Sequence, residues 1–513
     1  MGLRLRRRAG AALVALAAAL VLGLALLPAG MAHAEGAEGA PGGRIIPVAP
    51  VDPDSREGRV MLPIADWLEQ RLGAGSDGLR LSLSEPMWAE ERDGTVTVHL
   101  PGARLAAPSN DRDHLDLGDL AIAVTPRGGA AYDFESALPP AADRRAERFT
   151  VGESAVSGTW RSDLEIATRL DASAAQLRAL ERTSAGGAAI ASLAAVVLAD
   201  ELVERADGLW DGRYSLSLSG LESEDLSLGA AEFAGSFEGL DREAVLQMRR
   251  DLGIGMLGEV ELAPDALDFA FAPLFDGRWG RSDTTVTIRD LTMTISRVEP
   301  GGEERVALGE LVWQVEFDDR AAHAELATRI TVADLLLGWE GVAGLPSAFM
   351  PQGATVDLAL ERLPLRRLAE TFADLEERGE APESRRYSLP DDVLAHLDEA
   401  DTALDLREIH ARAPSYEFWA DGSLRVEPAS LFGLVGRVNA RIAGLSELLA
   451  LAVREGDEAA VAFLVVLQGL GRPVLDEGGG MAVHAYEFDL RRDGTVTVNG
   501  IPFDVLFRGD LSP

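Results

Sequence analysis

The chain has 513 residues, with 84 acidic against 48 basic side chains, a formal charge of −36 at pH 7, and no cysteine. A surface so negative repels phosphates, which excludes DNA and RNA as partners and disfavours anionic lipid headgroups. Without cysteine there is no disulfide, no lipid attachment through a thiol and no thiolate metal site. The length exceeds what one hydrophobic core usually serves, so we expect two or three domains or one elongated body.

The first 34 residues have the three parts of a secretory signal peptide. Four Arg lie between positions 4 and 8, an apolar run occupies residues 11–27, and an A-x-A site ends at Ala34. This pattern predicts export to the periplasm with cleavage after Ala34. The alternative is an uncleaved inner-membrane anchor, because the apolar run is just long enough to span a bilayer.

Residues 35–57 are rich in Gly, Pro and Ala without an apolar period, which predicts a flexible tether. The first helix is expected to start at Pro63, a residue that suits a first helical turn, and to stop at Gly73. Its apolar side chains recur at helical spacing. The rest of the chain is expected to form two β-rich halves with helices, residues 58–240 and 241–513.

Seven identical letters, RDGTVTV, occur at residues 92–98 and again at 492–498. Asp followed by Gly suits the centre of a tight hairpin turn, since Gly accepts a positive φ without a Cβ clash. The Thr/Val alternation that follows is typical of a half-buried strand. Each copy therefore predicts a β-hairpin.

Alternation of apolar and polar residues recurs along the chain and predicts antiparallel strands with one dry face. The apolar sets are Leu79, Leu81 and Leu83; Leu115 and Leu117; Tyr214, Leu216 and Leu218; Trp313, Val315 and Phe317. The alternation changes parity near Arg289 and Asp290, and again between Ala485 and Tyr486. Each change requires a bulge or a switch of buried face, and bulges bend strands, so we predict a strongly curved sheet.

Three strands are expected to run directly into helices, after Leu240, Leu363 and Leu445, which suggests a diverged strand–helix duplication. Residues 186–199 and 459–470 are nearly apolar all round and too short to span a bilayer. We predict both as helices buried against the dry face, with a membrane-surface or partner helix as the alternative. The fold class is thus α+β: a long, curved, antiparallel sheet with helices packed on one face.

A dinucleotide-type glycine pattern occurs at Gly253, Gly255 and Gly258, but it follows an expected helix and precedes an expected strand. The motif needs the reverse order, so that a helix N-terminus meets the pyrophosphate. We interpret these glycines as a helix stop and a loop. No cofactor is predicted.

One short acidic cluster could surround a divalent cation, although it lacks EF-hand spacing. Its members are Asp111, Asp113, His114, Asp116 and Asp119. Acidic clusters are expected by chance in so acidic a chain. The seven His, at positions 33, 99, 114, 323, 396, 410 and 484, form no metal-binding spacing, and no G-x-S-x-G elbow is present. The sequence therefore assigns no catalytic, cofactor-binding or metal-ligating residue.

Several segments resemble one protein family. They are ADWLEQRL at 65–72, MPQGATVDLALERLPLRRLAETF at 350–372, the run beginning LDLREIHARAPSYEFWADG at 404, and YEFDLRRDGTVTVNGIPF at 486–503. Together they resemble the alphaproteobacterial family catalogued as domain of unknown function 2125. The resemblance implies a secreted or envelope-anchored β-rich protein, similar in texture to AsmA-like envelope proteins, and it carries no catalytic residues. Some members have a membrane anchor where this chain has a cleavable-looking signal, so a soluble periplasmic form is expected.

These observations lead to a non-enzymatic envelope protein, either a scaffold or a cradle for an apolar ligand such as an acyl chain. Its expected partners are a lipid, another apolar ligand or an envelope protein, and peripheral membrane contact is left open. The alternatives are a hydrolase that uses dispersed carboxylates and a calcium-stabilised structural protein.

Overall fold

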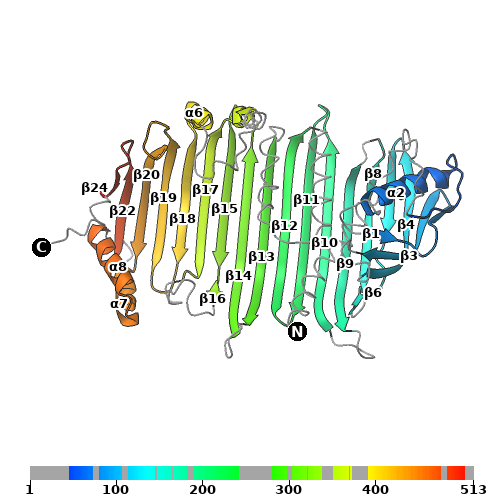
Figure 1. Ribbon diagram of the computed structural model, residues 1–513, viewed down its shortest axis with the longest axis horizontal. Helices are drawn as coiled ribbons and strands as arrows, with labels where there is room; N and C mark the ends of the chain where they lie inside the picture. Colours follow the sequence, from blue (N-terminus) through cyan, green and yellow to red (C-terminus); the bar gives the residue numbers. More distant parts are fainter. Residues whose placement is uncertain are drawn as a thin grey trace. The chain divides into compact units, whose positions relative to one another are not determined.

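The computed structural model describes residues 46–72, 80–106, 114–144, 147–163, 166–181, 189–241, 280–296, 303–319, 322–337, 350–368, 370–371, 391–474 and 482–502. The chain divides into two compact units, Met1–Ala266 and Leu267–Pro513. Both units consist mainly of antiparallel strands with few helices (Figure 1). The predicted β-rich antiparallel fold is confirmed.

Unit 1 contains one described helix and twelve described strands. These are α2 (Arg56–Leu72), β1 (Arg80–Ser82), β2 (Trp88–Arg92), β3 (Thr95–Ala106), β4 (His114–Gly128), β5 (Ala131–Ser136), β6 (Ala141–Arg144), β7 (Glu147–Thr150), β8 (Glu153–Arg161), β9 (Ile166–Glu181), β10 (Ala189–Glu204), β11 (Trp210–Ser223) and β12 (Leu226–Leu240).

Helix α2 begins seven residues before the predicted start, so Pro63 lies inside the helix rather than in its first turn. The Ser55 side chain accepts a hydrogen bond from the Gly58 backbone N–H at 2.9 Å, which caps the helix at Arg56. Proline has no N–H to donate to the preceding turn, so the helix lacks one backbone hydrogen bond at Pro63.

The inner face of α2 is buried against β1, β2 and β3. Its buried apolar residues are Val60, Met61, Ile64, Ala65 and Leu68. Burying side chains of this size stabilises a fold by about 1.5–3 kcal/mol each. The preceding chain joins this core, since the Ile46 N–H donates to Glu69 at 2.7 Å and Val48 forms a bridge with Met87. Residues 46–57 are thus structured, unlike the predicted tether.

The sheet of unit 1 has two short edge strands, β1 and β2, which pair with different segments of one side of β3, and β3 pairs with β4 on its other side. Between the long strands β4 and β9 lie two short pairs, β5–β8 and β6–β7. Strands β9 to β12 then follow in chain order.

A switch of buried face crosses strands β9, β10 and β11. Gln176 and Gly220 have φ of +55° and +63°, and both lie beside Ala194 of β10. A Cβ at Gly220 would lie 2.7 Å from the Ala194 Cβ, so this row needs glycine. The buried residues of β10 are Ala191 and Leu193 before the switch, and Val196, Leu198, Asp200 and Leu202 after it.

The predicted helix at residues 186–199 is therefore wrong, because the described part of this segment belongs to strand β10. The parity switch leaves a three-residue step between buried side chains, which imitates helical spacing. The alanine-rich composition reinforced that interpretation.

Unit 2 contains the remaining described elements. They are β13 (Arg281–Ser296), β14 (Glu303–Asp318), β15 (Ala324–Ala333), β16 (Leu336–Leu337), β17 (Gly353–Leu363), α6 (Asp391–Glu399), β18 (Ala403–Arg412), β19 (Glu417–Val426), β20 (Leu434–Ala443), α7 (Leu445–Glu455), α8 (Glu458–Leu470), β21 (Arg472–Val474), β22 (Val483–Leu490), β23 (Val496–Val498) and β24 (Ile501–Pro502). Residues 365–368 are also helical.

The strands of unit 2 pair in the order β13, β14, β15, β17, β18, β19, β20, β22, and β16 extends β15 alongside β14. On the far side of β22, strand β21 covers its first half and β23 its second. This edge resembles the β1–β2 edge of unit 1, because in both places two short strands pair with one longer strand.

Of the two predicted changes in the alternation of apolar residues, the one near Arg289 and Asp290 is confirmed as a local irregularity of strand β13. Asp290 has φ +53°, yet the register is the same on both sides of it, so no residue is inserted. The second is wrong: β22 pairs with β20 in one unbroken register. His484 and Tyr486 both point inward, and counting His484 as an outward polar residue produced the apparent change.

The predicted helix after Leu363 is present, and α7 begins at Leu445, where Gly444 precedes it as the N-cap, so Ser446 lies inside the first turn. The helix at 459–470 is present as α8, capped by Asp457, whose carboxylate accepts the Ala460 N–H at 2.9 Å. It is not buried as predicted, because Leu464 is its one buried residue and Phe463 and Val465 are 61% and 52% exposed. The helix expected after Leu240 lies outside the described residues. In the part of the chain that the structure describes, no helix is long and apolar enough to cross a membrane.

Candidate functional site

The sheet of unit 2 has one apolar and one charged face, and the strand registers show how the faces are assembled. Ile330 of β15 is paired with Val356 of β17, which is paired in turn with Ile409 of β18. The adjacent row is charged and, because side chains alternate along a strand, points the opposite way. In that row Arg329 lies 3.4 Å from Asp357 and 3.3 Å from Glu408.

A bulge on β18 keeps the two faces in phase. Leu406 and Ile409 oppose Leu358 and Val356 of β17, so three steps on one strand match two on the other. The extra residue allows both apolar side chains to remain on the apolar face. The sequence signal was present, since Leu404 and Leu406 are followed by Ile409, but the bulge was not predicted.

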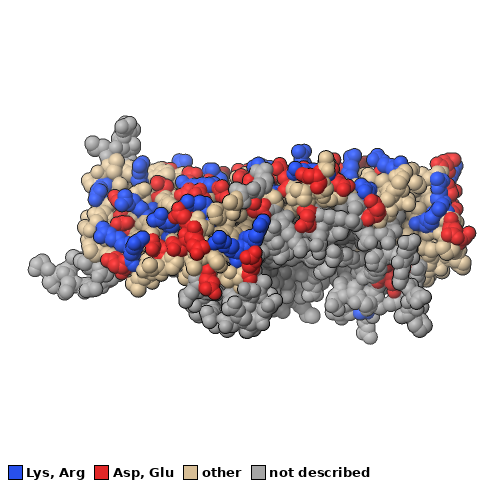
Figure 2. Space-filling model, turned by 90° about the horizontal axis from the view of Figure 1, so that it is seen from above, with Lys and Arg blue, Asp and Glu red and all other residues tan. Residues whose placement is uncertain are grey.

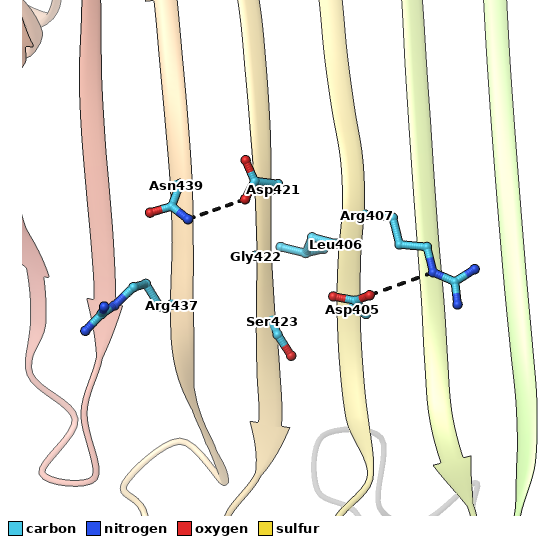
Figure 3. A pocket seen from close by; sticks show the side chains of 8 residues that line it. All are labelled: Asp405, Leu406, Arg407, Asp421, Gly422, Ser423, Arg437 and Asn439. Carbon is cyan, nitrogen blue, oxygen red and sulfur yellow. Dashed lines mark hydrogen bonds and ion pairs between the residues drawn. The ribbon is translucent and has the colours of Figure 1, made fainter. Parts of the chain in front are cut away.

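Beside this bulge, the charged face has a shallow depression of about 620 Å³ across β18, β19 and β20 (Figure 3). Its lining residues are Asp405, Leu406, Arg407, Asp421, Gly422, Ser423, Arg437 and Asn439. A Cβ on Gly422 would lie 2.4 Å from the Arg437 carbonyl oxygen. Only glycine permits this close approach of β19 and β20 at the floor of the depression.

The charged groups of the depression are already paired. Arg407 lies 2.5 Å from Glu325, 3.5 Å from Glu361 and 3.7 Å from Asp405. The hydrogen bond that Arg407 donates to Glu325 raises the pKa of Arg407, so this side chain stays positively charged. Arg437 pairs with Glu487 at 3.1 Å.

The Asn439 amide donates to Asp421 at 3.4 Å, while Ser423 contributes the one hydroxyl among the eight lining residues, which include neither histidine nor cysteine. A nucleophile needs an adjacent base to be activated, and the carboxylate opposite Ser423 in the strand register, Asp405, is already paired with Arg407 at 3.7 Å. The depression therefore has polar groups that can hydrogen-bond a polar ligand.

On the apolar face, α7 and α8 cover part of β19, β20 and β22. The buried cluster consists of Ala420, Ala440, Leu445, Leu448, Ala452, Leu464, Tyr486 and Val498. The Tyr486 hydroxyl donates to the Leu467 carbonyl at 2.9 Å, which ties β22 to α8. Burial raises the pKa of Tyr486 to about 12, because the phenolate is poorly solvated there.

Other parts of the apolar surface keep large side chains partly exposed. In unit 2 the Ile330 side chain, in the centre of a strand, is 38% exposed. In unit 1, Phe233 is also exposed and stacks on Tyr214 with ring centroids 5.3 Å apart. Both are among the described positions where an apolar ligand could contact a sheet.

The acidic cluster at 111–119 is only partly described. Asp116 lies 3.4 Å from Arg104, and Asp119 accepts the Gly102 N–H at 2.8 Å, so both carboxylates support the β3–β4 pairing. Asp111 and Asp113 lie outside the described residues, whereas His114 begins β4. Among the described residues, no group of three or more His, Asp or Glu could hold a metal ion.

The histidines are dispersed in the fold, as expected. His99 of β3 stacks on Trp88 with centroids 3.9 Å apart. His410 lies 2.9 Å from Glu417 and stacks on Trp419. His484 is buried in β22. The three glycines Gly253, Gly255 and Gly258 lie outside the described residues.

Comparison of the chain with protein-family models, curated proteins and solved structures finds no match.

Proposed function

We propose that the chain is an exported envelope protein that uses the apolar face of its antiparallel sheets to hold an apolar ligand, such as an acyl chain, without bond chemistry. The observation that carries the proposal is the separation of faces in unit 2. Ile330, Val356 and Ile409 form one apolar row, while the neighbouring row consists of ion pairs. Binding sites for acyl chains are concave or flat apolar surfaces with few polar groups.

The ionic face supports the envelope location that the signal peptide predicts. In the view from above in Figure 2, the described basic and acidic side chains are interspersed. Mixed charges keep a large sheet soluble and suppress sheet-to-sheet association. The resemblance to the family of domain of unknown function 2125 agrees with this role. We also propose that helices line one face of the sheets, that the sheets are curved, and that the fold arose from a duplicated strand–helix module.

The hydrolase and calcium alternatives would each need clustered acidic side chains. The described members of the 111–119 cluster are engaged with Arg104 and the Gly102 backbone, and the carboxylates of the depression face arginines or an amide. No observation on the described residues favours a hydrolase or a calcium-stabilised protein.

The cradle is tested by native mass spectrometry and lipid extraction of the purified chain, followed by titration with a fluorescent fatty acid. We expect a bound lipid, and we expect Ile330→Glu to weaken fatty-acid binding at least about tenfold, because a charge would enter the apolar row. Thr331→Glu is the matched control, since it adds the same charge one residue along on the opposite face. If no lipid is recovered and no fatty acid binds, the cradle is rejected and a scaffold remains.

A further inference from the structure

Two neighbouring turns in unit 2 display apolar side chains to solvent. The first, residues 427–433, joins β19 to β20, and the second, residues 491–495, joins β22 to β23. We call the two turns together the tip. Leu431 is 71% exposed and Phe432 is 60% exposed. Two consecutive large apolar residues so exposed are a feature of surfaces that contact a partner or a membrane.

The tip is held rigidly. Within the first turn, the Glu427 N–H donates to the Gly433 carbonyl at 2.9 Å and the Ser430 N–H to the Glu427 carbonyl at 2.9 Å. The Leu431 N–H donates across to the Arg492 carbonyl of the second turn at 3.1 Å. Leu431 and Phe432 are therefore presented on fixed backbone, and little conformational entropy is lost when they are buried.

The charges beside them are arranged with the positive ends outward. Arg492 pairs with Glu427 at 2.9 Å, but its side chain is 73% exposed against 15% for the carboxylate partner. Arg491 pairs with Asp489 at 3.0 Å, and here too the arginine side chain is the more exposed partner, at 55% against 28% for the aspartate. Asp493 is the exposed acid of the tip, and its carboxylate accepts the Thr495 N–H at 2.9 Å.

Exposed guanidinium groups on the turn next to an exposed apolar pair match the interface of a phospholipid bilayer. There Leu and Phe can enter the acyl boundary while arginines bind phosphate oxygens. The high negative charge of the rest of the chain opposes anionic membranes, so a zwitterionic surface fits best. We propose that the tip is a membrane-contact site that inserts Leu431 and Phe432 into a zwitterionic phospholipid bilayer. This site does not depend on the lipid cradle, because a scaffold could use it equally.

The absence of native cysteine permits a direct test on the full chain. Phe432→Cys is labelled with an environment-sensitive fluorophore and mixed with phosphatidylcholine vesicles. The label should shift to shorter wavelength and be quenched by nitroxide lipids. Adding Arg491→Gln and Arg492→Gln should raise the lipid concentration at half-binding several-fold, and Leu431→Ser should raise it about tenfold, since that apolar side chain no longer leaves water.

Two matched labels test the location. Asp93→Cys labels the turn of the twin hairpin, and Val465→Cys labels the exposed side of α8, which is also apolar. Neither should respond to vesicles. A silent label at 432, or an equal response at all three positions, overturns the proposal. So does a response at 432 without vesicles that grows with protein concentration, because the occupant would then be a second copy of the chain.

Discussion

The two RDGTVTV segments share seven letters but form different turns. In the first, Arg92 pairs with Thr95 and the two central residues have φ of +53° and +85°, which is a two-residue type I′ turn. In the second, the strands separate earlier, at Leu490 and Val496, and the longer loop has a positive φ at Gly494 alone. Identical local sequence therefore leaves the turn type open.

The neighbours of each turn account for the difference. Arg492 is held in its turn by the Leu431 N–H on its carbonyl and by Glu427 on its guanidinium. A Cβ on Gly94 would meet no atom within 4 Å, so no neighbouring segment packs against this side of the first turn. The first turn therefore adopts the two-residue connection that its local sequence favours. Tertiary contacts have overridden a local preference, as they often do in sheets.

Gly494→Val should have the largest effect. A β-branched residue is strained at φ +77°, and its Cβ would lie 2.9 Å from the Leu431 Cβ. Backbone strain and crowding together should lower the free energy of unfolding by about 3 kcal/mol. Urea denaturation and hydrogen exchange at β22 and β23 would measure the loss. Unchanged melting would show that the turn assignment is wrong.

Asn499→Ala should be nearly as costly and concerns the residue directly after the repeat. In the second copy, Asn499 has φ +52°, accepts the Glu487 N–H at 3.0 Å and donates to the carbonyls of Leu470 and Ala485. Losing these bonds should cost about 2–3 kcal/mol.

The matched substitution in the first copy is His99→Ala, where the chain continues straight as strand β3 and His99 stacks on Trp88. It should cost about 1 kcal/mol, as expected for one aromatic pair. Equal losses in the two urea titrations would contradict this account of why the copies diverge after their shared letters.

Gly94→Val isolates backbone strain from crowding. The φ of +85° should cost about 2 kcal/mol, with no added clash in the open space around this turn. Hydrogen exchange at β2 and β3 would measure it. Combining Leu431→Gly with Gly494→Val removes the Leu431 Cβ and the atoms beyond it, so the added effect of Gly494→Val on that background should be similar to the loss at Gly94; a larger effect would place the extra cost elsewhere than at Leu431.

The same reasoning explains what sequence could predict in this protein. The hairpins and several of the strands followed from Asp-Gly pairs and alternation, and the irregularity at Asp290 followed from a change of parity. The same change of parity occurs in the sequence around Arg407, where the structure has a bulge. The pattern alone could not distinguish an inserted residue, as at Arg407, from a residue with a positive φ, as at Asp290. At Ala194 a switch of buried face imitated a helix. The paired turns of the tip depend on contacts across more than 60 residues of sequence, such as Arg492 to Glu427, which no local pattern specifies.

Asp493 gives the smallest effect and a last contrast between the copies. The hydrogen bond from the Thr495 backbone N–H holds the pKa of Asp493 below its ordinary value of 3.8. Because the folded-state pKa is lowered, the stabilisation is present above the unfolded pKa and is lost as the pH falls through the lower folded value. The second hairpin should therefore weaken slightly below about pH 4.

Asp493→Asn keeps an oxygen for Thr495 but removes the titration, so unfolding midpoints measured between pH 5 and 2.5 should lose this small component. Asp93→Asn is the control, since Asp93 sits at φ +53° in a turn where asparagine is equally well tolerated. The hydrogen bond from Thr495 belongs to the second turn. If Asp93→Asn changed the pH dependence of unfolding by the same amount, the acid sensitivity would come from the overall charge and not from this bond.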